Sequence, residues 1–233
     1  MKKLEGKIAL ITGGNSGIGL ATTKPMTIRE RVRVHARTFD RRTSYRKGEM
    51  DITETFARQI VLAARPHDRP KPSDFRLEET AIPTPSAGQV LLRVQYLSLD
   101  PYMRGRMDDR KSYAKPVPLG GVMDGESVAT VIASQHPGYS EGDIVLAQTG
   151  WRTHALSDRA DLRKLDPAVA PVTTRLGVLG MPGFTAYGGL RVIGKPAPGE
   201  TMVVAAASGP VGSLVGQLAK RPLAPYSAAA HVH

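Results

Sequence analysis

The chain has 233 residues, and 41% of them are hydrophobic, which is enough for one or two domains with a buried core. Cysteine is absent, which excludes disulfides and thiolate metal sites, and the six histidines show no metal-ligand spacing, so we expect no metal. No apolar run reaches the length of about 18 residues that crosses a bilayer, and the N-terminus does not resemble a signal peptide. We therefore expect a cytoplasmic protein without a membrane partner.

The first motif is a glycine run between a predicted strand and a predicted helix. Lys7-Ile8-Ala9-Leu10-Ile11 is typical of a short buried parallel strand, Thr12-Gly13-Gly14-Asn15-Ser16-Gly17-Ile18-Gly19 follows, and a helix is expected from Ile18 to Lys24. Such a turn lets the backbone approach a pyrophosphate at the helix N-terminus. Pro25 then interrupts the helix and no second apolar run follows, so residues 1–24 are interpreted as a βα fragment.

Residues 25–56 are predicted to form a basic linker. Between Pro25 and Met50 there are eight Arg or Lys residues and three acidic residues, so this segment carries +5 of the net charge of +11. Such a run binds nucleic acid or an acidic membrane in some proteins, and binding with a steep salt dependence, lost on deleting residues 25–49, would indicate that role. The segment has two aromatic residues and no nucleic-acid motif, which favours a solvated or disordered linker and no specific nucleic-acid partner.

Residues 57–186 are predicted to form a compact, mostly antiparallel β-barrel. Three β-rich runs, residues 89–97, 127–133 and 143–147, are separated by turn signals such as His136-Pro137-Gly138. Helix is expected near Thr174 to Leu179 and again after Thr185.

A second strand, glycine turn and helix occupy residues 187–220. Met202 to Ala206 is predicted as a strand, Ala206-Ala207-Ser208-Gly209-Pro210-Val211-Gly212 as the turn, and Val211 to Lys220 as the helix. Pro210 costs little at a helix start because its missing amide has no helical partner there. After Gly212 only 21 residues remain, with Pro222 and Pro225 among them, so the sequence predicts an incomplete Rossmann domain and a tail over 221–233. The two glycine turns are expected to compete for one place in a sheet.

Several motifs in a fixed order resemble one known family. They are Leu99-Asp100-Pro101-Tyr102-Met103-Arg104-Gly105-Arg106-Met107, Gly142-Asp143, Gly150-Trp151, Leu179 to Tyr187, and Ala206 to Gly212. From about Arg58 to Lys220 the chain resembles the zinc-free, NADP-dependent double-bond reductases of the medium-chain dehydrogenase/reductase superfamily, which include prostaglandin, alkenal and curcumin reductases. The resemblance implies an α/β fold with a GroES-like barrel and a doubly wound Rossmann domain.

Residues 1–24 resemble instead the opening of a short-chain dehydrogenase, so the chain looks like a truncated fusion. In that family a tyrosine is followed four residues later by a lysine, and none of the seven tyrosines here has that neighbour. A short-chain dehydrogenase activity is therefore not expected.

The reductase resemblance implies that NADP(H) delivers a hydride to the C=C bond of an α,β-unsaturated ketone or aldehyde, without zinc. Tyr102 is the candidate catalytic residue, either as a hydrogen-bond donor to the developing oxyanion or, in the alternative, as a packed ring. Arg104 and Arg106 either contact phosphate or support the turn, and Trp151 lines the substrate pocket or belongs to the core. The resemblance implies these cofactor contacts: Met181, Thr185, Ala207, Ser208, Gly209, Val211 and Gly212.

Two interpretations of function follow from these features. One is an NADP-dependent enone or enal reductase, with a homodimer left open. The other is a catalytically inactive truncated fragment that associates with an intact relative, because a sheet that ends after one strand leaves an unpaired edge and an uncovered apolar face.

Overall fold

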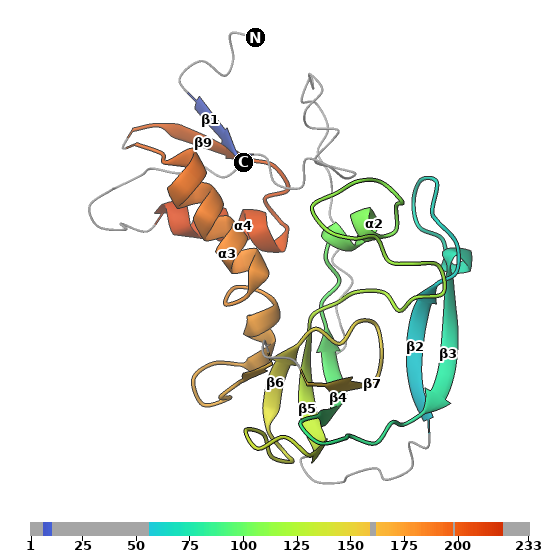
Figure 1. Cartoon of the computed structure of the whole chain (residues 1–233). Coiled ribbons are helices and arrows are strands. Elements are labelled where there is room, and N and C mark those ends of the chain that lie inside the picture. Colours follow the sequence, from blue (N-terminus) through green and yellow to red (C-terminus); the bar gives the residue numbers. More distant parts are fainter. Residues whose placement is uncertain (1–6, 11–55, 159–161, 198, 221–233) are drawn as a thin grey trace, which may run out of the picture.

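The structure is a computed structural model that describes residues 7–10, 56–158, 162–197 and 199–220 (Figure 1). Its strands are β1 (Lys7–Leu10), β2 (Phe56–Leu62), β3 (Phe75–Ala81), β4 (Val90–Leu97), β5 (Ser127–Ser134), β6 (Ile144–Ala147), β7 (His154–Ser157), β8 (Arg163–Lys164) and β9 (Thr201–Val204). Its helices are α2 (Tyr102–Arg106), α3 (Met181–Gly188) and α4 (Pro210–Lys220), with 3-10 helices η2 (Pro72–Asp74) and η3 (Val172–Leu176) and the π-helix η4 (Gly189–Gly194).

A five-stranded antiparallel sheet, in the order β7-β4-β5-β6-β8, forms the centre of the larger part of the molecule. The three β-rich runs predicted from the sequence are its strands β4, β5 and β6, so these predictions are confirmed. Valine and leucine side chains from these strands pack into one fully enclosed core, which explains why apolar, β-branched runs were needed there. That core is formed by Val90, Leu92, Ala129, Val131, Val145, Ala147 and Leu162.

The hairpin of β2 and β3 closes onto this sheet through the segment that precedes β7. The amide of Ile60 donates to the carbonyl of Trp151 at 2.8 Å, and on the other side of the segment the amide of Val94 donates to the carbonyl of Thr153 at 2.8 Å. Residues 151–153 therefore lie between β2 and β4 and continue the hydrogen-bonding into a barrel. The expected GroES-like, mostly antiparallel barrel is confirmed.

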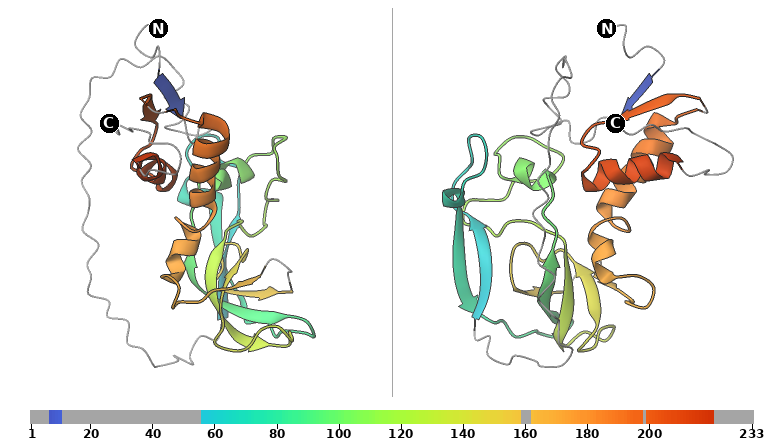
Figure 2. Two further views of the ribbon diagram at one scale, coloured as in Figure 1. Left: turned by 90° about the vertical axis from the view of Figure 1, so that its left-hand side faces the viewer. Right: turned by 180° about the vertical axis from the view of Figure 1, so that it is seen from behind.

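A smaller unit, formed by α3, η4, β9 and α4, follows the barrel along the chain. Figure 2 shows this unit at one end of the molecule. The helix predicted near Thr174 to Leu179 is the 3-10 helix η3, and α3 begins at Met181, earlier than the sequence indicated. Pro182 in the first turn of α3 explains the early start, because its ring fixes a helical φ where no amide partner is needed. The predicted strand and helix at 202–220 are confirmed as β9 and α4.

Strand β1 pairs in parallel with β9, with Ile8 opposite Met202. The expectation that the two glycine-turn units compete for one place in a sheet is therefore wrong, because the two strands occupy neighbouring places and share hydrogen bonds. The helix predicted from Ile18, the glycine motif before it and the basic linker lie outside the described residues.

None of the helices in the described part of the chain is long and apolar enough to cross a membrane.

Candidate cofactor site and active site

The turn between β9 and α4 is built by a close backbone approach. Ala206 has a left-handed φ of 52°, and its carbonyl accepts the amide of Gly209 at 2.9 Å. A Cβ on Gly212 would lie 2.4 Å from the same carbonyl oxygen, far inside van der Waals contact. Only glycine therefore allows the first turn of α4 to pack against the turn that leads into it.

Five of the residues predicted to contact the cofactor lie together in this turn and at the start of α4: Ala207, Ser208, Gly209, Val211 and Gly212. Ser208 is exposed and Gly212 is buried, so the outer rim of the turn is accessible to a ligand while its base is packed. Pro210 is the first residue of α4, one residue before the predicted start at Val211. The first amides of a helix have no helical acceptors, so they can bind an anionic diphosphate here.

The other two predicted cofactor contacts, Met181 and Thr185, lie one turn apart on α3 and are exposed. The hydroxyl of Thr185 donates to the carbonyl of Met181 at 2.8 Å, so its proton is used within the helix and its oxygen remains able to accept. Helices α3 and α4 pack on each other through a core that includes Ala186 and Val215. The structure thus places all seven predicted cofactor residues on one unit.

Tyr102 is the first residue of α2, at the edge of an apolar cluster beneath that helix. Burial raises the pKa of Tyr102 to about 12, and the neighbouring carboxylates of Asp100 and Asp124 act in the same direction. The phenol is therefore protonated at neutral pH. Among the described residues its hydroxyl has no hydrogen-bond partner, so it is available as a donor, while its ring packs against the cluster.

The two arginines of α2 support the local structure, as one of the two alternatives predicted. Arg104 forms an ion pair with Asp108 at 2.7 Å and donates to the carbonyls of Pro66 and Asp68 at 3.2 and 3.1 Å. Because the guanidinium of Arg104 donates to carbonyls of the loop after β2, it connects α2 to that loop.

Arg106 is held in a similar way by the backbone and by two aromatic rings. It donates to the carbonyl of Lys115 at 3.0 Å, and its guanidinium carbon lies 5.8 Å from the ring centroid of Tyr102 and 5.6 Å from that of Tyr113. Its Nε is also 3.7 Å from a carboxylate oxygen of Asp124. The guanidinium of Arg106 therefore lies over one face of the Tyr102 ring and restricts its position.

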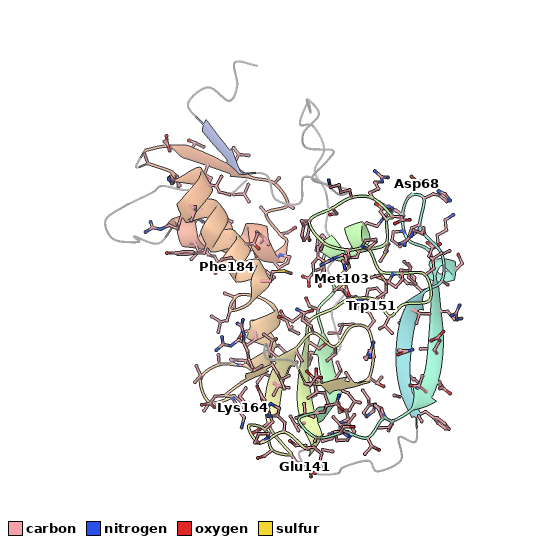
Figure 3. The ribbon with its side chains drawn as sticks, viewed as in Figure 1. Asp68, Met103, Glu141, Trp151, Lys164 and Phe184 are labelled. Atoms are coloured by element: carbon pink, nitrogen blue, oxygen red, sulfur yellow. The ribbon has the colours of Figure 1, made fainter. Side chains whose placement is uncertain are left out.

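Trp151 belongs to the core beneath α2. Its ring stacks on Phe75 with 5.5 Å between the centroids, and Figure 3 shows it close to Met103. Trp151 packs against the buried cluster that contains Met103, and a Cβ on Gly125 would meet both side chains. This packing favours the core interpretation of Trp151 over a substrate wall.

A cavity of about 300 Å³ lies elsewhere, between β2, β3 and β7. Its wall includes Arg58, Gln59, Arg152 and His154, and none of the site residues predicted from the sequence. These residues are scattered along the chain and match no motif, so sequence analysis had no signal for this cavity.

Comparisons with known proteins agree with this architecture. Residues 58–165 match the family described as the N-terminal domain of oxidoreductase. The NADPH-dependent curcumin reductase of Escherichia coli (strain K12) is 58% identical over 163 residues, which are 70% of this chain and 47% of that protein. Prostaglandin reductase 1 of Oryctolagus cuniculus is 41% identical over 167 residues, 70% of this chain and 46% of that protein.

Among solved structures, CurA from Vibrio vulnificus in complex with NADPH superposes with a TM-score of 0.66 at 54% identity, covering 70% of this chain and 48% of that one. The chain spans about half the length of the curated relatives it matches. Over the matched residues the chain is thus a relative of the zinc-free, NADP-dependent double-bond reductase branch of the medium-chain dehydrogenase/reductase superfamily.

Proposed function

We propose that this chain is an NADP-dependent oxidoreductase that reduces the C=C bond of an α,β-unsaturated ketone or aldehyde without zinc. The observation that carries the proposal is the β9–turn–α4 unit, in which Gly212 brings the start of a helix against a tight turn. The names of the relatives support the substrate class, since they include a curcumin reductase and a prostaglandin reductase. The NADPH complex of Vibrio vulnificus CurA supports the cofactor.

The residues of the turn fit a diphosphate. Its rim residue Ser208 is exposed, its amides precede or open α4, and the buried Gly212 leaves no side chain between the turn and the helix. Bound NADPH would supply the hydride for the β-carbon of the substrate. The role proposed for Tyr102 is to donate a hydrogen bond to the substrate carbonyl oxygen, which stabilises the negative charge that develops there.

A titration with NADPH, followed by nucleotide fluorescence, tests the cofactor site. Ser208→Asp adds a negative charge at the exposed rim without a new buried atom, and Ser208→Asn is the matched neutral control. We expect the aspartate variant to raise the Kd for NADPH about tenfold or more, equivalent to about 1.4 kcal/mol, and the asparagine variant to change it little. Equal Kd values for both variants, or a folded chain that binds no NADPH, would refute the proposal.

An enone reduction assay tests the role of Tyr102. Tyr102→Phe keeps the ring and removes the donor, so we expect kcat to fall about 100-fold or more while the Kd for NADPH stays the same. Tyr113→Phe is a matched control, because Tyr113 contacts the same Arg106 and is exposed. A Tyr102→Phe variant with the kcat of the unmodified chain would assign Tyr102 to packing alone.

A second candidate is a non-catalytic chain that associates with a relative or with a second copy. The observation that favours it is an apolar surface on α3 and η4, where Phe184 is 79% and Ile193 is 78% exposed. Sedimentation velocity of the chain and of its Ile193→Ser variant tests this candidate. A sedimentation coefficient that falls on substitution supports association, and a monomer in both cases excludes self-association through this face. In either case we infer a cytoplasmic location.

A further inference from the structure

Arg152 lies in the wall of the cavity between β2, β3 and β7. Its side chain forms no ion pair or hydrogen bond with the other described residues. It lies directly opposite Gln59 in an isolated antiparallel bridge, so the two side chains share one face of the barrel. Its Nε is buried and has no hydrogen-bond partner among the described residues. Burial also lowers the pKa of the Arg152 guanidinium, because removal from water disfavours its charged form.

The two carboxylates on the neighbouring strand β3 are already engaged. Glu79 accepts the Nε of Arg58 at 3.0 Å. Glu78 accepts Arg76 at 2.6 Å and the amide of Gln59 at 3.1 Å, and these hydrogen bonds lower its pKa. Among the described residues no ion pair is formed by Arg152, so the cavity has an excess of positive charge. A half-buried cation without a counter-ion is unfavourable, and a bound anion would remove that cost.

The rest of the wall sets the shape of the anion. Most of the accessible lining is polar, and Ala81, Pro83 and Leu156 contribute a smaller apolar part; the cavity volume of about 300 Å³ is at the lower end of the range for small-molecule sites. A ligand that fits therefore combines one anionic group with a small apolar body.

We propose that this cavity is a binding site for a small organic carboxylate, whose carboxylate group pairs with the guanidinium of Arg152 and whose apolar part packs against Pro83 and Leu156. A planar guanidinium pairs well with a carboxylate because two parallel hydrogen bonds can form. The site is separate from the proposed reductase site, since neither Tyr102 nor any residue of the 206–212 turn lines it.

Calorimetric titration of the full chain with benzoate and with the neutral isostere benzamide tests this proposal. We expect benzoate to bind and benzamide to bind at least about tenfold more weakly. Arg152→Gln should weaken benzoate binding at least about tenfold, equivalent to about 1.4 kcal/mol. Arg163→Gln is the matched control, because Arg163 is exposed on β8 and does not line the cavity.

Two further measurements distinguish loss of benzoate binding from loss of stability and from loss of NADPH binding. The unliganded Arg152→Gln variant should melt at the same temperature as the parent chain or higher, because it loses an unpaired cation. The Ser208→Asp variant should bind benzoate normally, which separates this site from NADPH binding. Equal binding of benzoate and benzamide, unchanged binding by Arg152→Gln, loss of benzoate binding in Ser208→Asp, or no benzoate binding by the parent chain would each overturn the proposal.

Discussion

The barrel and the α3–β9–α4 unit are stabilised by different kinds of packing. In the barrel, the large side chains of Val90, Leu92 and Val145 are completely buried. In the unit, the core contains the small residues Ala186 and Ala219. Two glycines there approach backbone oxygens so closely that a Cβ would lie within 2.4 Å of one: Gly183 beside Val178 and Gly212 beside Ala206. The barrel therefore depends on buried volume, and the unit depends on close backbone contact.

The difference extends to the strands. In the barrel β4 and β5 each pair with a strand on both sides, whereas the described sheet of the unit contains only β1 and β9. The unit also presents Phe184 and Ile193 to solvent. Large-to-small substitutions should thus affect the barrel most, and small-to-large substitutions the unit.

The largest effect is expected for Leu92→Ala in the barrel. Removing this fully buried side chain leaves a cavity, so the free energy of unfolding should fall by about 3 kcal/mol, measured by urea denaturation. Leu77→Ala on β3, where the side chain is 62% exposed, is the control and should change the free energy by less than about 0.5 kcal/mol. Equal effects of the two substitutions would contradict the role assigned to buried volume.

Gly212→Ala should be the most damaging small change in the unit. The added Cβ meets the Ala206 carbonyl, so we expect about 2 kcal/mol of local destabilisation, seen as faster amide hydrogen exchange across residues 202–218. Gly188→Ala on α3 is the control, since its Cβ would meet nothing within 4 Å and alanine favours the helix. Unchanged exchange in Gly212→Ala would show that the close approach is not required.

Arg104→Gln tests the attachment of α2 to the barrel. The substitution removes the ion pair to Asp108 and the hydrogen bonds to Pro66 and Asp68, so we expect a loss of about 1.5 kcal/mol in the free energy of unfolding. Arg110→Gln, at an exposed position in the following loop, is the control and should have almost no effect. Thermal melting of both variants measures the difference, and equal melting temperatures would mean that water replaces these contacts without cost.

The smallest effect concerns alkaline pH. In the folded chain burial raises the pKa of Tyr102 from its usual value of 10 to about 12, so the folded state holds this proton more tightly than the unfolded state. The contribution to stability is complete below pH 10 and is lost as the pH rises towards 12. Because the side chain is only half-buried, about 1 kcal/mol is expected. A Tyr102→Phe variant should lose less stability over this pH range, and identical losses would assign the effect to other groups.

Local patterns in the sequence predicted much of this structure. The runs at β4, β5 and β6 are continuous stretches of β-branched and apolar residues, and the strand, glycine turn and helix at 202–220 follow one another directly in the chain. The catalytic and cofactor roles of Tyr102 and of the residues on α3 and α4 stay predictions, as does the domain boundary after residue 186. Ala186 itself packs with Leu190 and Val215, which favours placing α3 with the second unit.

Other elements carry no comparable local signal. Strand β3 reads Phe-Arg-Leu-Glu-Glu-Thr-Ala and has exposed residues on both faces, so its pairing with β2 specifies it more than its own composition does. Helix α2 has five residues, including Gly105, and lies where no helix was predicted from the sequence. These elements depend on partners that are distant in the chain.

The sequence by itself determined the β-rich character of the central region, the turn that positions α4 and the absence of cysteine chemistry, because each depends on residue type and short spacing. The tertiary structure decided that β1 pairs with β9, that Arg104 and Arg106 support α2, and that Arg152 lines a cavity between β2, β3 and β7. Pairing between distant strands, and contacts between side chains that are far apart in the chain, are set by three-dimensional proximity, which no local pattern encodes.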